Sequence, residues 1–168
     1  MNKGLELIEA RWLFNVLPEK IKIIIHPEAI IHSMVEFIDG TISASLFCPD
    51  MRFPILRALS YPDIVKSDLP RVDFSVTNNF SFGSPDEGKF PALKVAFDAL
   101  EKGGTVPAVL NSANEKAVNM FLEEKIKFTD IVRIVEEITE KHKRISEPLL
   151  EDIISAHKWA AEEVLRLC

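Results

Sequence analysis

Cysteine and glycine are scarce in this sequence of 168 residues. The two cysteines, Cys48 and Cys168, are too few for a disulfide framework and lie at no metal-binding spacing. The six glycines form neither G-x-G-x-x-G nor a P-loop, so the sequence holds no nucleotide-binding fingerprint. These absences argue against a disulfide-stabilised secreted fold and make a reducing, cytoplasmic compartment the simplest expectation.

Long hydrophobic runs and an excess of positive charge are also absent. Runs such as Ile23-Ile24-Ile25 are far shorter than the roughly 20 residues that span a bilayer, and no secretory signal opens the sequence. The 26 acidic residues outnumber the 20 basic ones, for a formal net charge of -6. We therefore expect neither a membrane nor a nucleic-acid partner, and an anionic ligand must be held by a few placed groups.

What is present is the composition of a globular protein, 47% hydrophobic and 27% charged. The patterning predicts an α+β fold in three parts. Residues 1–60 read as part of an α/β domain with a β-hairpin-containing sheet, residues 61–90 as a proline-interrupted linker, and residues 91–168 as a four-helix bundle.

The first part alternates between helical and extended patterns. Asn2 is predicted to cap a helix over residues 3–14, whose apolar face holds Leu5, Ile8, Trp12 and Leu13. The β-branched run at 20–25 predicts a buried strand. Residues 33–38 and 41–47 alternate around Asp39-Gly40, which predicts a hairpin with a tight turn of positive φ angles. A short helix is expected over 54–59.

The later parts are predicted in less detail. A strand is expected near 72–76 in the linker. Helices are expected over 92–101, ending at Gly103-Gly104, then over 107–124 and from Phe128 or Thr129 onward. Ser146 and Pro148 are predicted to open the last helix. The residues expected to be buried by these last two helices are Ile131, Ile134, Val135 and Ile138, then Leu150, Ile153, Ile154, Trp159, Ala160 and Val164.

The first helical turn holds the residues best suited to binding chemistry. Backbone N–H groups and the positive end of the helix dipole favour an anion such as phosphate there. Lys3 adds a positive charge, Asn2 both donates and accepts hydrogen bonds, and Glu6 offers an oxygen ligand for Mg²⁺ or Mn²⁺. On spacing alone, Asn2 and Glu6 are also ordinary helix-start residues, and one carboxylate does not define a metal site.

Other polar residues favour structural roles. His26 and His32 are a candidate metal or acid–base pair, but histidines at strand ends are more often packed and hydrogen-bonded, and no zinc-like spacing accompanies them. The polar stretch at residues 111–115 is better explained by hydrogen bonds between helices than by ligand binding.

Several sequence blocks together resemble the 1-deoxy-D-xylulose 5-phosphate reductoisomerase family. They are Met1-Asn2-Lys3-Gly4-Leu5-Glu6, Ile25-His26-Pro27, Ile31-His32-Ser33-Met34-Val35, Pro49-Asp50-Met51-Arg52, Phe90-Pro91-Ala92-Leu93 and Leu110-Asn111-Ser112-Ala113-Asn114-Glu115. They span nearly the whole chain in the family's order. The resemblance implies the later part of a catalytic domain, a linker and a helical domain.

The resemblance also implies roles for named residues. Asn2, Lys3 and Glu6 would contact the sugar phosphate substrate, and Glu6 would help to coordinate a divalent metal, Mg²⁺, Mn²⁺ or Co²⁺. Met51 would lie near the nicotinamide of NADPH. His32 would shape the pocket without a catalytic step. The family reaction rearranges and reduces 1-deoxy-D-xylulose 5-phosphate with NADPH, giving 2-C-methyl-D-erythritol 4-phosphate for isoprenoid precursor synthesis.

The sequence also departs from the family. Met1 falls inside the motif, so we expect the dinucleotide-binding domain and the other metal-binding carboxylates to be missing and this chain alone to be inactive. A homodimer is expected, in the cytoplasm or in the plastid stroma of a plant or alga. Two alternatives stay open: a non-catalytic dimerisation or interaction module that uses the hairpin edge, and a fragment of another sugar-processing dehydrogenase.

Overall fold

The computed structural model describes residues 1–86 and 88–167. It is mostly helical, with one small antiparallel sheet, which confirms the α+β class. The chain forms two compact units, Met1–Ile23 with Pro85–Cys168 and Ile24–Ser84. The domain boundaries predicted at residues 60 and 90 do not coincide with the limits of these two units. They stay a prediction. Cys168 lies outside the described residues.

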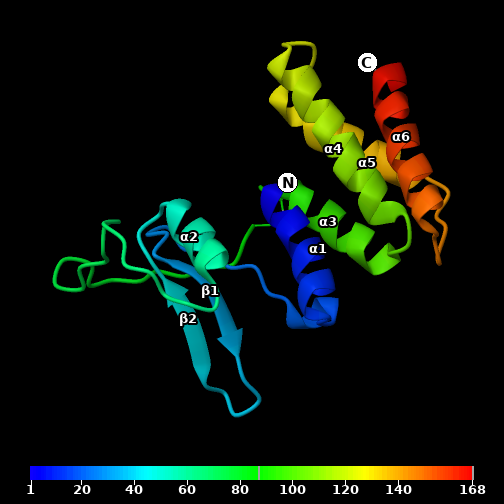
Figure 1. Cartoon of the computed structure of the whole chain (residues 1–168). Coiled ribbons are helices and arrows are strands. Elements are labelled where there is room, and N and C mark those ends of the chain that lie inside the picture. The colour runs from blue at the N-terminus through cyan, green and yellow to red at the C-terminus, as the bar shows by residue number, and fades with distance from the viewer. Residues whose placement is uncertain (87, 168) are drawn as a thin grey trace. The chain divides into compact units, whose positions relative to one another are not determined.

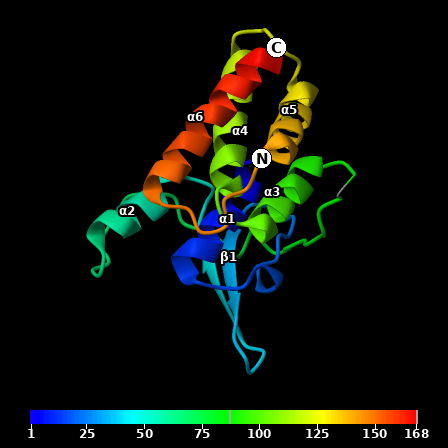
Figure 2. The same ribbon diagram turned by 90° about the vertical axis from the view of Figure 1, so that its right-hand side faces the viewer.

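The first unit is helical. It contains α1 (Asn2–Phe14), the 3₁₀ helix η1 (Pro18–Lys20), α3 (Pro91–Lys102), α4 (Val106–Leu122), α5 (Phe128–Lys141) and α6 (Leu150–Leu167). Helix α4 lies beside both α5 and α6, and α1 packs on α3 (Figures 1 and 2). The N-terminal helix therefore shares its unit with the helices of the C-terminal part.

One continuous apolar core holds these helices together. Fully buried aliphatic side chains such as Val109, Leu110, Val135 and Ile138 form its centre, and Leu7 and Ile8 of α1 belong to the same cluster. Among the described residues, no helix is long and apolar enough to cross a bilayer.

The inner face predicted for α5 is confirmed, whereas the prediction for α6 is only partly correct. Ala160 and Val164 are buried, but Leu150, Ile153 and Ile154 are exposed. Helix α6 begins at Leu150 rather than near Ser146, because the Asp152 carboxylate accepts the Leu149 N–H at 2.9 Å and thereby caps the helix. Trp159 packs partly buried against the core.

One prediction for α1 was wrong and another only partly correct. Asn2 is the first helical residue and Met1 is the N-cap, because the Asn2 side chain bonds to Glu6 instead of to the backbone. Of the predicted apolar face, Ile8 is buried and Leu5 packs partly buried against the core, whereas Trp12 and Leu13 are exposed. The apolar positions of the sequence fit more than one helical face, and contact with α3 decided which face is buried.

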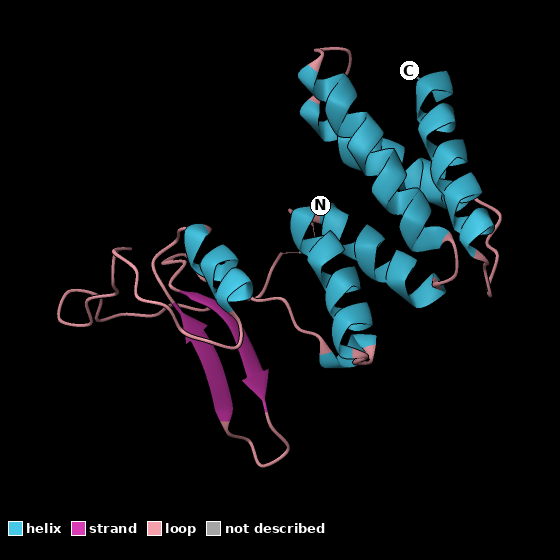
Figure 3. Cartoon of the chain, viewed as in Figure 1, coloured by secondary structure: helices cyan, strands magenta, loops and turns pink. Residues whose placement is uncertain are grey.

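The second unit contains the hairpin of β1 (Ile31–Glu36) and β2 (Ile42–Leu46), shown as the magenta strands of Figure 3. The strands are antiparallel, with Met34 opposite Ala44. Of the predicted turn pair, only Gly40 has positive φ, at 84°. Asp39 instead accepts hydrogen bonds from the Thr41 N–H and hydroxyl at 2.9 and 2.7 Å, which lower the pKa of its carboxyl.

Helix α2 (Arg52–Ser60) follows the hairpin, starting two residues before the predicted position. The ring of Phe53 in this helix lies 5.4 Å from that of Phe47. The helix is therefore tied to the end of β2 by an aromatic contact.

Two predicted strands are not formed. Instead of a strand over 20–25, the chain forms η1 and then an irregular segment, because Ile21 and Ile23 pack against the helical core rather than a sheet. Residues 74–76 form turns held by the Asp73 carboxylate, which accepts the Ser75 N–H at 2.8 Å. Gly83 pairs with Ile25 in an isolated bridge, so the segment predicted as a linker folds back within its own unit.

Candidate functional site

The first turn of α1 brings together three of the four predicted site residues. The Glu6 carboxylate accepts the Asn2 amide N–H at 2.9 Å through one oxygen and the Lys3 ammonium at 2.7 Å through the other. Residues three and four apart lie on one side of a helix, which explains the grouping. All three residues are exposed, so a ligand can reach an amide, a cation and a carboxylate within one helical turn.

The backbone of this turn is partly occupied by the helix itself. The N–H groups of Gly4 and Leu5 both donate to the Met1 carbonyl, at 2.8 and 3.1 Å. The predicted anion site therefore depends on the Lys3 side chain and the helix dipole more than on these two N–H groups.

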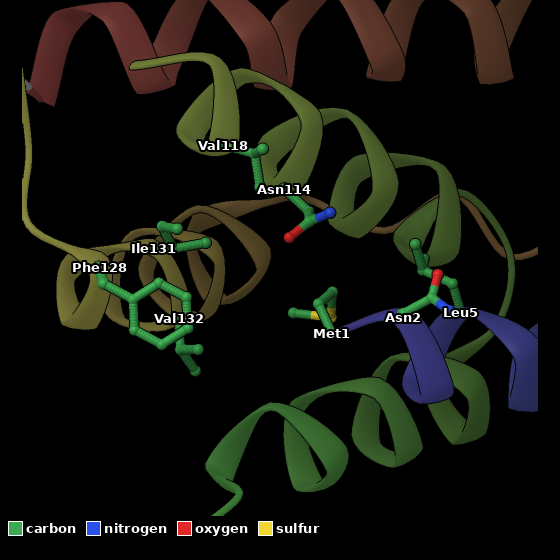
Figure 4. A pocket seen from close by; sticks show the side chains of 8 residues that line it. All are labelled: Met1, Asn2, Leu5, Asn114, Val118, Phe128, Ile131 and Val132. Carbon is green, nitrogen blue, oxygen red and sulfur yellow. The ribbon is translucent and has the colours of Figure 1, made fainter. Parts of the chain in front are cut away.

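A hollow of about 280 Å³ adjoins this turn (Figure 4). Met1, Asn2 and Leu5 line it from α1, and residues of α4 and α5 line the rest: Asn114, Val118, Phe128, Ile131 and Val132. Asn114 Oδ1 is buried and has no hydrogen-bond partner among the described residues. No local pattern indicates that Asn2 and Asn114, which belong to helices distant in the sequence, line one hollow.

The polar stretch around Asn114 otherwise plays the structural part predicted for it. Ser112 is buried, and its hydroxyl donates to the His157 carbonyl oxygen at 2.6 Å, which joins α4 to α6. This bond confirms the prediction of hydrogen bonding between helices.

Metal ligands are too few here for a complete site. Among residues 1–86 and 88–167, no group of three or more His, Cys, Asp or Glu side chains is placed to hold a metal ion. Glu6 offers carboxylate oxygens, but they already pair with Asn2 and Lys3. A hard divalent cation takes about six oxygen ligands, so the residues present do not by themselves fit one.

Met51, the fourth predicted residue, belongs to the second unit. It precedes α2 directly and its side chain is exposed. The neighbouring Asp50 carboxylate accepts hydrogen bonds from the Arg52 guanidinium at 2.6 to 3.0 Å, and this pairing lowers the pKa of Asp50. The pair orders the loop that presents Met51.

The two candidate histidines are packed residues. The side chain of His26 is 6% exposed, with Nδ1 2.9 Å from the Ser81 carbonyl oxygen and 3.0 Å from the Glu28 carboxylate, and its ring stacks on Phe82. His32 stacks on Phe47 with the ring centroids 3.7 Å apart. Neither histidine is placed for metal binding, in agreement with the structural interpretation of the sequence.

The Glu28–Ser81 contact was missed by sequence reasoning. The Glu28 carboxylate accepts the Ser81 hydroxyl at 2.6 Å and the Ser81 N–H at 3.1 Å, and these bonds lower the pKa of Glu28. The two residues are 53 positions apart, and no local pattern connects them.

A family model described as "DXP reductoisomerase C-terminal domain" matches residues 46–163. The chain belongs to the 1-deoxy-D-xylulose 5-phosphate reductoisomerase family. The reductoisomerase of Acetivibrio thermocellus is 48% identical over 99% of this chain, and that of Chlorobium chlorochromatii is 51% identical over 96%. The chain spans 44% and 42% of these relatives, less than half of their length.

Solved reductoisomerases have the same fold over this stretch. The Zymomonas mobilis enzyme in complex with NADPH matches with a TM-score of 0.90 at 42% identity, over 99% of this chain and 44% of that one. A reductoisomerase in complex with NADPH, fosmidomycin and magnesium matches with a TM-score of 0.91 at 38% identity, over 98% of this chain and 43% of that one. The resemblance inferred from the sequence blocks is thereby confirmed.

Proposed function

We propose that this chain forms part of the catalytic apparatus of a 1-deoxy-D-xylulose 5-phosphate reductoisomerase. The reaction rearranges 1-deoxy-D-xylulose 5-phosphate and reduces the product with NADPH to 2-C-methyl-D-erythritol 4-phosphate. The observation that carries the proposal is the Asn2–Lys3–Glu6 cluster on one turn of α1. It stands in a chain about half identical to reductoisomerases over nearly all of its length.

Each residue of the cluster has a part that its chemistry suits. Lys3 supplies a mobile ammonium with three donors for the substrate's anionic group, reinforced by the positive end of α1. The Asn2 amide, which donates to Glu6 in this structure, both donates and accepts with sugar hydroxyls. Substrate binding then replaces bonds within the cluster by bonds to the ligand, and the cluster is ordered before the ligand arrives.

We propose that the metal and NADPH are bound jointly with the N-terminal part of a reductoisomerase, which this chain does not span. Glu6 would give one oxygen ligand to Mg²⁺, Mn²⁺ or Co²⁺, and the exposed Met51 would contact the nicotinamide. A reductoisomerase of the same fold has been solved with NADPH and magnesium, which supports the two cofactors rather than the individual residues. Because the sequence lacks a nucleotide-binding fingerprint and the described residues lack a three-ligand group, we propose that this chain alone is inactive.

The deciding assay measures NADPH oxidation by the purified 168-residue chain with 1-deoxy-D-xylulose 5-phosphate and Mn²⁺. No turnover is expected from this chain. Turnover is expected when the chain is fused to the preceding part of the Acetivibrio thermocellus enzyme, and Glu6→Gln in the fusion should abolish most of it. Turnover by the chain alone would refute its proposed inactivity, and an inactive but folded fusion would refute the proposed function.

The finer architecture belongs to the same proposal. Helices α3 to α6 would form a four-helix bundle, residues 1–60 the later part of the catalytic domain and residues 61–90 the linker. The contacts of α4 with α5 and α6 support the bundle. The proposed compartment is the cytoplasm, or the plastid stroma for a plant or algal chain.

We also propose that the chain forms homodimers through the β1–β2 hairpin. Five of the six β1 residues and all five β2 residues are exposed. Apolar side chains including Val35, Phe37 and Ile42 are more than half exposed. An exposed apolar strand pair is a template for pairing with another chain, and an identical hairpin is its simplest complement.

A further inference from the structure

Gly4 lies at a close contact between α1 and α3. A Cβ atom added to Gly4 would lie 2.5 Å from the Cβ of Ala96 and 3.5 Å from the carbonyl oxygen of Ala92. Carbon atoms in van der Waals contact are about 3.5 to 4.0 Å apart. The two helices can therefore cross at this distance only because residue 4 has no side chain.

The crossing faces away from the proposed substrate site. Gly4, Leu7 and Ile8 are the buried residues of α1, and their spacing of three and four places them on one side of the helix. Asn2, Lys3 and Glu6 follow the same spacing, are exposed and lie on the other side. Packing at Gly4 therefore sets the position of the cluster without touching a ligand.

We infer that Gly4 is a positioning residue for substrate binding, an inference that rests on the proposed function. Because Gly4 has no side chain, the first turn of α1 packs directly against Ala96. This contact fixes the position of the Asn2–Lys3–Glu6 cluster relative to Asn114 and the other α4 and α5 residues around the hollow (Figure 4). A side chain at residue 4 would displace the turn by roughly 1 Å, the difference between 2.5 Å and an ordinary carbon–carbon contact.

Helix stability and helix position respond differently to this change. Alanine has a higher helix propensity than glycine, so Gly4→Ala strengthens α1 as a helix while forcing it away from α3. Leu7 and Ile8 keep α1 attached to the core. The expected effect is a shifted site on a folded protein.

A double-mutant cycle in the 168-residue chain tests the inference. The variants are Gly4→Ala, Ala96→Gly and the two combined, because removing the Ala96 Cβ takes away the atom that the new methyl group would meet. Ala160→Gly, at a fully buried position of α6, is the control for general destabilisation. Two properties are followed by NMR: the methyl signals of Leu5, Val118 and Val132, and the shift of the Asn2 side-chain amide on titration with 1-deoxy-D-xylulose 5-phosphate.

Gly4→Ala should move the methyl signals and weaken binding on the order of 10- to 100-fold, as expected for a site displaced by about 1 Å. The combined variant should restore both, a rescue that a purely destabilising change would not show. Ala160→Gly should lower the melting temperature and leave the methyl signals in place. Wild-type signals in Gly4→Ala, or no recovery in the combined variant, would overturn the inference.

The two readouts separate this inference from the proposed function. If the Asn2 amide does not respond to 1-deoxy-D-xylulose 5-phosphate even in the fused, full-length protein, the proposed function fails. The methyl signals still report whether Gly4 and Ala96 set the position of α1. If the amide responds and Gly4→Ala binds as tightly as wild type, the positioning role alone fails.

Discussion

Lys3 takes part in two interactions of different strength. Its ammonium pairs with Glu6 across an exposed surface, and such pairs stabilise a protein by only about 0.2 to 1 kcal/mol. A charge-assisted bond to a substrate contributes about 1.5 to 3 kcal/mol, or roughly ten- to more than a hundredfold in affinity. The function of Lys3 should therefore be visible in binding and nearly invisible in stability.

We expect Lys3→Ala to weaken binding of 1-deoxy-D-xylulose 5-phosphate at least tenfold and to change the melting temperature little. Calorimetric titration and thermal unfolding of the same preparation measure both quantities. Lys141→Ala is the matched control, because Lys141 pairs with Glu137 at 2.6 Å in an exposed pair on α5. If both variants lose the same affinity, Lys3 is not a substrate-binding residue.

Single residues of the site could be identified from the sequence, but their partners could not. Asn2, Lys3 and Glu6 lie within one helical turn, so their spacing predicts that they meet. Asn114 lies on another helix and depends on the packing of α1, α4 and α5. The predicted Asn2 cap was wrong because the side chain had a nearby alternative, the Glu6 carboxylate.

At the scale of elements, the connection from α5 to α6 is held by a buried threonine. The hydroxyl of Thr105 lies 2.7 Å from His142 Nε2 and accepts the Ile145 N–H at 3.1 Å. Thr105 N–H in turn donates to the Ile145 carbonyl at 3.1 Å. The Thr105 oxygen has two acceptor lone pairs, so which group donates in its bond to His142 Nε2 depends on the tautomer of the imidazole.

This arrangement predicts a dependence of stability on pH. Burial lowers the pKa of His142 below its ordinary value of 6.5. As the pH falls through about 6.5, the unfolded chain takes up a proton that the folded chain does not yet bind. The free energy of unfolding should therefore decrease below about pH 6.5 and be unaffected by this group above it.

Urea unfolding at about pH 7.5 and about pH 5.5, on either side of that value, measures the effect. Carboxyl groups also contribute over this range, so the wild type is compared with His142→Gln, which keeps a hydrogen-bonding side chain but does not titrate. We expect a smaller loss of stability at low pH in His142→Gln. An equal loss in both proteins would contradict the assignment to His142.

At the scale of the whole molecule, the exposed hairpin predicts self-association. Sedimentation should give twice the mass of the 168-residue chain for the wild type and the single mass for Val35→Lys, which places a charge in the proposed contact. Val76→Lys, at an exposed position outside the hairpin in the same unit, should leave the dimer intact. A wild-type monomer, or a dimer that survives Val35→Lys, would rule out this contact.

The helices, the hairpin and the family could be predicted from the amino-acid sequence alone. Each rests on local information: the buried spacing of Ile131, Ile134, Val135 and Ile138 in α5, the alternation around Asp39-Gly40, and short blocks such as Asn2-Lys3-Gly4-Leu5-Glu6. Helical period, strand alternation and turn chemistry act over a few residues, and the sequence displays them directly.

Tertiary packing was needed to show which helix faces are buried and which distant residues meet. Trp12 and Leu13 fit an apolar helix face but are exposed, Ile21 and Ile23 pack against helices instead of forming a strand, and Glu28 bonds to Ser81 across 53 positions. By propensity alone, Gly4 is an unfavourable residue in a helix, and its role becomes evident only from the close contact with Ala96. The physical reason is that burial and close contact depend on what another segment brings to the same place, and no short stretch of sequence contains that information.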